Sequence, residues 1–272
     1  MALVADGGFP GAAALPSALA PDFARELQGR RPAVFLDYDG TLTPIVERPQ
    51  DALLSPRMRQ VVSELAARCP VCVVSGRDRG VVQELMGIRD LTVAGSHGFD
   101  IWSPERGSLH RQGAQQAALI ERVTGQLREE AQHIPGALVE PKAVSVAVHY
   151  RQVDERRRDE VLDLVERLLA EHEGRLKVTP GKMVREIQPA IDWDKGRAVL
   201  YLLHVLDLEG EGIAPLYLGD DETDEDAFTA LRDRGVGILV LEPDADPPRR
   251  TAARFTLQGT GEVERFLDAI GR

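Results

Sequence analysis

Asp37 and Asp39 stand two residues apart in the run Asp-Tyr-Asp-Gly-Thr, directly after the apolar residues 33–36. The apolar residues predict a buried strand, and where that strand ends the second acid can turn back beside the first. Two neighbouring carboxylates repel each other unless a proton or a cation lies between them. Such a pair suits one carboxylate as nucleophile and metal ligand, and the other as general acid or base. An Asp before Gly is also common in structural turns, so the run alone leaves that alternative open.

A second acidic cluster follows another apolar run, residues 214–218. Six of the seven residues in 220–226 are Asp or Glu. Acidic residues complement the dipole at a helix N-terminus, which accounts for some of them. Six acids exceed what a helix start needs, and carboxylates at two strand ends form the hard-oxygen site that Mg²⁺ prefers. The two clusters together therefore predict a magnesium site.

A phosphate group beside such a metal needs positive charge or hydrogen-bond donors. Ser75, Gly76 and Arg77 follow the apolar run 71–74 and offer a hydroxyl and backbone N–H groups. Lys195 begins a predicted helix, so its ammonium and the positive helix end can both face an anion. A lone Ser-Gly is usually a turn and a lone Lys is usually solvated, so each signal is weak by itself.

The elements that must position these residues follow an alternating pattern. Strands that alternate with amphipathic helices predict a parallel sheet, and ligands bind beyond the carboxyl ends of such strands. We predict an α/β fold: a Rossmann-like parallel sheet core with helices on both faces, plus an inserted smaller α+β domain. The predicted core strands are 33–37, 71–74, 91–94, 214–218, 236–240 and 254–257, and the predicted core helices are 55–66, 78–86, 193–206, 224–234 and 261–270.

The middle of the chain changes character, because helices there alternate with hairpin-like strands. We predict an inserted α+β domain over 104–188, within a core of 25–103 and 189–272. Residues 1–24 are rich in Ala, Gly and Pro and predict a flexible N-terminal tail. The tail lacks the basic start of a secretory signal.

Composition narrows the possible partners. The net charge of −11 disfavours nucleic acid and anionic membranes, and no apolar run reaches the length of a membrane-spanning helix. Cys69 and Cys72 form a C-x-x-C pair without further ligands for zinc, and the apolar run around Cys72 favours packed, reduced thiols. Such low cysteine content suits a cytoplasmic protein.

Four segments taken together resemble the motifs of the haloacid dehalogenase-like phosphatase superfamily. The matches run in order from Asp37–Thr41 through Ser75 and Lys195 to Gly219-Asp220-Asp221 with Asp224. The resemblance covers about residues 30–272. Short motifs are individually weak, but four in order at predicted strand ends and helix starts are specific.

Five further segments carry a narrower resemblance: residues 95–98, 144–150, 181–186, 191–196 and 219–228. They are similar to the signature segments of the trehalose-6-phosphate phosphatase family. In that family the inserted domain is a cap that closes over the sugar, and residues matching Glu140, Lys142 and Glu186 contact the sugar hydroxyls. Pro141 and Arg185 depart from residues that the family often has there. Gly76, Arg77, His97 and Lys182 are further predicted substrate contacts, and for His97 the alternative is that it only shapes the loop after its strand.

The resemblance implies hydrolysis of trehalose 6-phosphate through an aspartyl-phosphate on Asp37, the last step of trehalose biosynthesis. As a hypothesis, Asp39 is the acid and base, while Lys195 and Ser75 stabilise the phosphoryl group. Asp37, the Asp39 carbonyl and Asp220 hold Mg²⁺, and Asp221 and Asp224 support the metal and Lys195.

Three other functions stay open at this point. They are a phosphatase for another sugar phosphate, such as sucrose phosphate, a phosphomutase, and a regulator that binds a sugar phosphate without turnover. The expected partner is a small sugar phosphate. We expect a monomer, with association with a trehalose-phosphate synthase left open.

Overall fold

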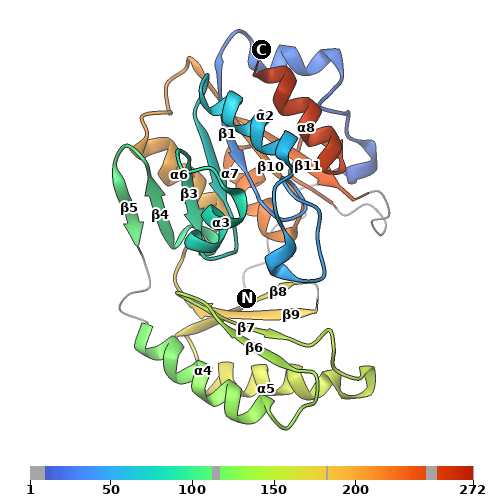
Figure 1. The fold of residues 1–272 in the computed structure, drawn as a ribbon, viewed down its shortest axis with the longest axis vertical. Coiled ribbons are helices and arrows are strands. Elements are labelled where there is room, and N and C mark those ends of the chain that lie inside the picture. Colours follow the sequence, from blue (N-terminus) through green and yellow to red (C-terminus); the bar gives the residue numbers. More distant parts are fainter. Residues whose placement is uncertain (1–9, 112–116, 182, 243–249, 272) are drawn as a thin grey trace. The chain divides into compact units, whose positions relative to one another are not determined.

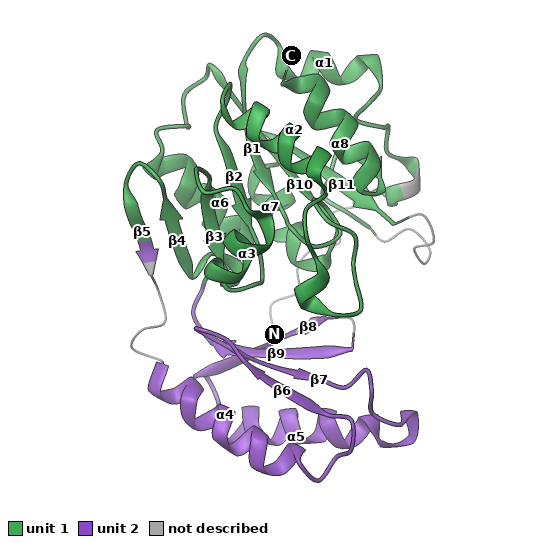
Figure 2. Cartoon of the chain, viewed as in Figure 1, with its two compact units in different colours: residues 1–109, 193–272 green, residues 110–192 purple. Residues whose placement is uncertain are grey.

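The structure is a computed structural model and describes residues 10–111, 117–181, 183–242 and 250–271. The chain divides into two compact units (Figure 2). Unit 1 comprises Met1–Leu109 and Trp193–Arg272, and unit 2 comprises His110–Asp192. In the described residues, no helix is both long enough and apolar enough to cross a membrane.

Unit 1 is built on an eight-stranded sheet in the order β12-β11-β10-β1-β2-β3-β4-β5 (Figure 1). Neighbouring strands are parallel from β12 to β3, and β4 runs antiparallel to β3. The strands are β1 (Arg31–Leu36), β2 (Val71–Val74), β3 (Thr92–Gly95), β4 (Asp100–Ser103), β5 (Gly107–Arg111), β10 (Ile213–Gly219), β11 (Val236–Leu241) and β12 (Phe255–Gln258).

The central strands form because their sequences are apolar on both faces. All four residues of β2 and of β3 are buried, and so are the last four of β1. A parallel sheet covered by helices on both faces requires such continuous apolar strands. β4 and β5 extend the sheet at one edge. The strand pairing of unit 1 therefore continues past residue 104, the predicted start of the inserted domain.

Helices cover both faces of this sheet. One apolar cluster contains residues from α2, α3 and α8, and a second contains residues from α6 and α7. The start of α2 follows the sequence, because the Ser55 hydroxyl accepts a hydrogen bond from the Met58 N–H and Pro56 occupies the first turn. The helices of unit 1 are α1 (Ala24–Leu27), α2 (Pro56–Ala66), α3 (Arg79–Met86), α6 (Lys195–Val205), α7 (Glu225–Leu231) and α8 (Gly259–Ile270).

Residues 10–24 pack against unit 1, which corrects the prediction of a flexible tail for this stretch. The Phe23 ring stands edge-on to Phe255 and Phe266, with ring centroids 5.1 and 4.9 Å away. The Thr256 N–H donates to the Pro16 carbonyl, and the Ala18 N–H donates to the Thr256 carbonyl. The Ala- and Pro-rich composition hides this docking, because one aromatic anchor and a few backbone bonds provide it. Residues 1–9 lie outside the described residues.

Cys69 and Cys72 are both free thiols and both buried. Burial raises the pKa of Cys69 to about 11 and that of Cys72 to about 12. The C-x-x-C spacing therefore places two packed, protonated thiols next to and within β2.

Unit 2 is a four-stranded antiparallel sheet in the order β6-β7-β9-β8 with two helices. Val146, Val148 and Ile187 belong to one apolar cluster with residues of both helices. Because side chains alternate along a strand, Ala147 and its neighbours Glu140 and Glu186 lie on the opposite face. The elements are α4 (Ala117–Ala131), β6 (Leu138–Pro141), β7 (Val146–His149), α5 (Arg158–Glu171), β8 (Leu176–Gly181) and β9 (Val184–Pro189). The predicted fold class, a parallel α/β core with an inserted α+β domain, is confirmed.

Candidate active site

Asp37 and Lys195 form a buried ion pair at the carboxyl end of β1. Asp37 follows the last residue of β1, and its side chain is 6% exposed. Lys195 is the first residue of α6, and its Nζ donates to Asp37 Oδ1 over 2.7 Å. The helix starts there because the Asp194 side chain accepts a hydrogen bond from the Arg197 N–H. The N-terminal end of α6 thus delivers a cation to the end of β1.

Asp224 is the partner that holds Lys195 from the other side. Asp224 Oδ1 accepts hydrogen bonds from Lys195 Nζ and from the Tyr217 hydroxyl, each over 2.7 Å. Its other oxygen accepts from the backbone N–H groups of Asp220 and Asp221. Both carboxylate oxygens of Asp224 are therefore occupied, which suits a residue that organises the site.

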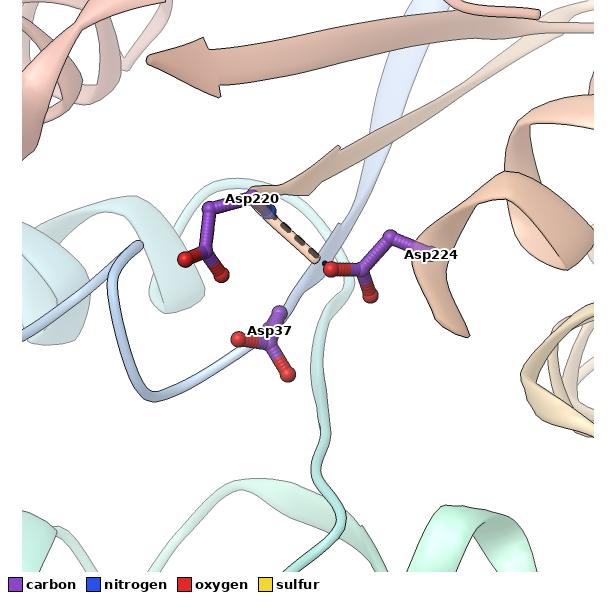
Figure 3. A group of neighbouring side chains, drawn as sticks. All are labelled: Asp37, Asp220 and Asp224. Carbon is purple, nitrogen blue, oxygen red and sulfur yellow. Dashed lines mark hydrogen bonds between the residues drawn. The ribbon is translucent and has the colours of Figure 1, made fainter. Parts of the chain in front are cut away.

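Three carboxylates face a common space, as Figure 3 shows for Asp37, Asp220 and Asp224. One oxygen from each lies within 4.8 Å of the others. Asp220 Oδ1 is buried and has no hydrogen-bond partner among the described residues. Gly40, at φ +81°, allows this approach, because a Cβ there would lie 2.1 Å from Asp220 Oδ2. A buried, unpartnered oxygen among carboxylates fits a divalent cation, because Asp37 and Asp220 have oxygen lone pairs beyond the one that Lys195 occupies.

The pKa shifts of the buried groups also favour a bound cation. Burial, with the nearby Asp224 and Asp39 carboxylates, raises the pKa of Asp37 to about 8 even though Lys195 opposes the shift. Burial and the Asp37 carboxylate raise the pKa of Asp220 to about 9. Burial alone would lower the pKa of Lys195, but Asp224 and Asp37 raise it well above its ordinary value. The cluster thus holds more negative charge than Lys195 balances, and a cation would relieve the excess.

Asp39 is paired with Arg77. The guanidinium of Arg77 donates through Nε and one terminal nitrogen to both Asp39 oxygens, each over 2.6 Å. A third Arg77 nitrogen donates to the Pro49 carbonyl. The pairing links the turn after β1 to the turn after β2, where Ser75 is 1% exposed and its Oγ accepts from the Arg77 N–H. Ser75, Arg77 and Asp39 are thus brought together at neighbouring strand ends.

The turn after β3 contacts the Ser75 turn. Ser96 and His97 both have left-handed backbone, at φ 50° and 55°. The His97 N–H donates to the Ser75 carbonyl over 2.8 Å. The His97 ring lies over Gly76, because a Cβ on Gly76 would stand 2.8 Å from the ring. The structure therefore brings Gly76 and His97 together with Ser75.

The predicted sugar-contacting residues of unit 2 form their own polar cluster. Lys142 Nζ donates to one Glu186 oxygen over 2.8 Å, and the Ser145 hydroxyl donates to the other over 2.6 Å. Glu140 Oε2 and His149 Nε2 form a hydrogen bond over 2.7 Å, and this bond lowers the pKa of Glu140. Lys182, the remaining predicted contact, lies outside the described residues.

Two residues in these clusters were not anticipated from the sequence. Tyr217 stands in the apolar strand β10 and is fully buried, so its hydroxyl resembles an ordinary core group until Asp224 is placed beside it. Ser145 lies in the family-like segment 144–150 without any feature that marks it, yet it is 1% exposed and its hydroxyl donates to Glu186. The sequence does contain one signal for Tyr217. It is a hydroxyl-bearing residue in an otherwise apolar strand, close to the acidic cluster of residues 220–226.

The comparisons with known proteins agree with this geometry. The family described as trehalose-phosphatase matches residues 35–260. The trehalose-phosphate phosphatase of Mycobacterium tuberculosis is 43% identical over 262 residues, which cover 95% of this chain and 66% of that protein. Trehalose-phosphate phosphatase B of Arabidopsis thaliana is 38% identical over 267 residues, which cover 94% of this chain and 71% of that protein.

A solved structure shares the fold. The C-terminal domain of C. albicans trehalose-6-phosphate phosphatase superposes with a TM-score of 0.78 at 22% identity, covering 94% of this chain and 98% of that one. This chain spans slightly less than two thirds of the mycobacterial relatives' length. The matched residues include Asp37, Ser75, Lys195 and Asp220, which the fold brings to neighbouring strand ends and a helix start. The chain belongs to the trehalose-phosphatase family.

Proposed function

We propose that this protein hydrolyses trehalose 6-phosphate to trehalose and inorganic phosphate. The observation that carries the proposal is the buried Asp37–Lys195–Asp224 arrangement beside Asp220, in a chain of the trehalose-phosphatase family. A phosphatase that works through a carboxylate needs a nucleophile at a strand end, a cation beside it and a place for a metal. In unit 1, Asp37, Lys195 and the carboxylates beside Asp220 are the candidates for these three parts.

Asp37 is the proposed nucleophile. Lys195 binds Asp37 Oδ1, which orients the carboxylate and directs its other oxygen to the substrate. That oxygen forms a bond to phosphorus while the bond from phosphorus to the sugar oxygen breaks, giving an aspartyl-phosphate. Water then attacks phosphorus, the bond to Asp37 breaks, and inorganic phosphate leaves.

Asp39 is the proposed acid and base. In the first step a proton passes from Asp39 to the departing sugar oxygen, and in the second Asp39 takes a proton from the attacking water. In this structure Arg77 donates to both Asp39 oxygens, so Asp39 is held as an acceptor. Arg77 must therefore give up at least one of these bonds before Asp39 donates. The substrate's phosphate is the natural new partner for Arg77.

Positive and polar groups stabilise the transferring phosphoryl group. Lys195 supplies a charge from the start of α6, and Ser75 supplies its hydroxyl from the end of β2. Gly76 itself has no side chain that could block the approach of the phosphate to its backbone. Such fixed donors are most effective in a buried site, where water does not compete with them.

The metal that suits the site is Mg²⁺. Asp37, the Asp39 carbonyl and Asp220 would hold it, because they supply hard oxygen ligands. When bound, Mg²⁺ supplies positive charge to the phosphate oxygens. Asp224 supports this arrangement through the N–H groups of Asp220 and Asp221, and Asp221 completes the reciprocal cap at the start of the same segment.

Metal-free protein is expected to lose stability as pH rises. The pKa values of Asp37 and Asp220, about 8 and about 9, lie above their ordinary value of 3.8. The folded state thus binds these protons more tightly than the unfolded chain does. The resulting stability is full below about pH 4 and is lost as the pH approaches 8 to 9. Melting temperatures of chelator-treated protein between about pH 5 and pH 9 measure the effect.

Two comparisons sharpen this measurement. Added Mg²⁺ should restore the melting temperature most at the alkaline end, because the ion neutralises the same carboxylates. Asp220→Asn removes one of the two groups, so its metal-free melting temperature should fall less steeply. A melting temperature of the metal-free wild type that stays flat or rises across this range would contradict the prediction.

The polar cluster of unit 2 is proposed to bind the sugar. Glu140, Lys142 and Glu186 line one face of its sheet, and two donors hold Glu186. Lys182 is proposed as a further contact. Paired carboxylates and an ammonium are suited to bind sugar hydroxyls, because together they accept and donate hydrogen bonds.

Glu186→Gln is expected to lower kcat/KM for trehalose 6-phosphate by about tenfold or more, since the amide cannot accept the same set of hydrogen bonds. Hydrolysis of p-nitrophenyl phosphate, which has no sugar hydroxyls, should change less than about twofold. Glu171→Gln, an exposed position on α5, is the matched control and should leave both activities unchanged. Equal losses on the two substrates would argue against a sugar contact.

The decisive experiment is phosphate release from trehalose 6-phosphate with and without Mg²⁺. Glucose 6-phosphate, sucrose 6-phosphate and mannose 6-phosphate are compared in parallel. We expect a strong, magnesium-dependent preference for the trehalose ester. Better hydrolysis of another ester would be compatible with Asp37 as the nucleophile, but it would contradict trehalose 6-phosphate as the substrate. Binding without turnover would favour a regulator, and return of the phosphoryl group to sugar would indicate a mutase.

A further inference from the structure

The turn between β3 and β4 adopts an unusual backbone. Ser96, His97 and Gly98 have consecutive φ values of 50°, 55° and 92°. Residues with side chains rarely adopt this left-handed region, and two in succession persist only where the surroundings hold them there. What holds this turn therefore indicates what the turn is for.

Three hydrogen bonds tie the turn to the end of β2. The Ser96 N–H donates to the Arg77 carbonyl over 2.7 Å, and the His97 N–H donates to the Ser75 carbonyl over 2.8 Å. The Ser96 hydroxyl donates to Asp78 Oδ1 over 2.8 Å. Every one of these bonds ends on residues 75–78, which include the proposed phosphate-binding turn.

The His97 side chain makes the closest approach to that turn. A Cβ on Gly76 would lie 2.8 Å from His97 Cε1 and 2.9 Å from Nε2, so the imidazole rests on the Gly76 backbone. On its other side the turn meets α6, because a Cβ on Gly98 would lie 2.3 Å from the Ala198 Cβ. Lys195 begins that helix. The turn thus lies between the two elements that carry Ser75 and Lys195.

We infer that His97 is a positioning residue that seats its ring on Gly76 and fixes the Ser75–Gly76–Arg77 turn for the phosphoryl group. The inference rests on the proposed phosphatase function, and it assigns His97 a role different from the predicted sugar contact. Phosphoryl transfer depends mainly on positioning, so a small displacement of this turn is costly. Gly76 has no side chain, so the His97 ring can pack directly against its backbone.

His97→Asn is the most informative single variant. Asn tolerates left-handed backbone better than most residues, so the turn keeps its conformation, yet Asn lacks the ring atoms over Gly76. We expect kcat/KM to fall about tenfold for trehalose 6-phosphate and equally for p-nitrophenyl phosphate. Competitive inhibition by inorganic phosphate should weaken by a similar factor, because the phosphate-binding turn itself is loosened.

The companion variant is Gly76→Ala. The φ of Gly76 lies outside the left-handed region, so this position can accommodate Ala. In the wild-type background its Cβ collides with the His97 ring, and kcat/KM should fall about 100-fold. In the His97→Asn background the same change should cost less than about threefold, because the atoms it meets are absent. Melting temperatures establish that each variant is folded.

His204→Ala is the matched control, since His204 is an exposed histidine on α6 that is hydrogen-bonded to Glu209. It should leave every rate unchanged. A His97→Asn loss confined to trehalose 6-phosphate would overturn the inference in favour of a sugar contact. A Gly76→Ala cost that is equal in both backgrounds would overturn it as well. If the wild type hydrolyses p-nitrophenyl phosphate but not trehalose 6-phosphate, the proposed substrate fails while the His97 comparison still gives its answer.

Discussion

Asp37→Asn is expected to reduce kcat for trehalose 6-phosphate by at least about 10⁴-fold, to the background of the assay. An amide is not a nucleophile towards phosphorus, so no covalent intermediate forms. The fold should persist, because the Asn oxygen can still accept the hydrogen bond that Lys195 now donates to Asp37 Oδ1. Burial raises the pKa of Asp37 to about 8, so replacing it removes a charge that the site accommodates poorly.

The measurement is phosphate release together with the melting temperature of the same preparations. Metal-free Asp37→Asn should melt at or above the wild-type temperature at about pH 8, which separates lost chemistry from lost structure. Asp207→Asn is the matched control, because Asp207 is 84% exposed on its side chain and its left-handed backbone suits Asn. Normal turnover by Asp37→Asn would rule out Asp37 as the nucleophile.

Lys195→Met is expected to lower both activity and stability. The ammonium is 3% exposed and lies 2.7 Å from an oxygen of Asp37 and from one of Asp224. Removing it leaves two buried carboxylates without their cation, which costs about 3–5 kcal/mol in comparable buried pairs. The loss of charge beside the phosphoryl group should reduce kcat by about 10²- to 10³-fold.

A double variant tests the charge argument directly. Lys195→Met with Asp37→Asn removes one positive and one negative charge, so the buried cluster keeps the net charge of the wild type. Stability should largely return, whereas activity should not, and chemical denaturation without metal at about pH 9, above the pKa of Asp37, measures the difference. A double variant as unstable as Lys195→Met alone would show that packing of the lysine stem, rather than charge balance, stabilises the site.

The sequence predicted which polar residues of unit 1 lie at the carboxyl edge of the sheet, because each of them follows a recognisable strand. Asp37, Ser75 and Asp220 each follow an apolar run, and parallel strands bring such positions to one edge of a sheet. Lys195 was recognisable because a helix start follows Asp194. Local patterns were sufficient here, since each residue is placed by the element next to it.

Other features depend on contacts between distant segments, which local patterns do not contain. The Arg77–Asp39 pair requires β1 and β2 to be neighbours and the two turns to meet. Tyr217 looks like a core residue until Asp224 folds back on it. Phe23 packs against Phe255 and Phe266, which lie far away in the sequence. The composition of residues 10–24 does not contain this contact, and it therefore suggested a flexible tail.

The two buried thiols have a practical consequence. Cys69 and Cys72 are the only cysteines in the chain, and with raised pKa values they are poor nucleophiles towards labelling reagents. A cysteine introduced at Leu53 in unit 1 and another at Leu138 in unit 2, both exposed positions, would therefore take up a fluorophore pair with the native thiols left in place. Energy transfer between such dyes would measure whether the distance between the two labelled positions changes during turnover, in an otherwise unaltered chain.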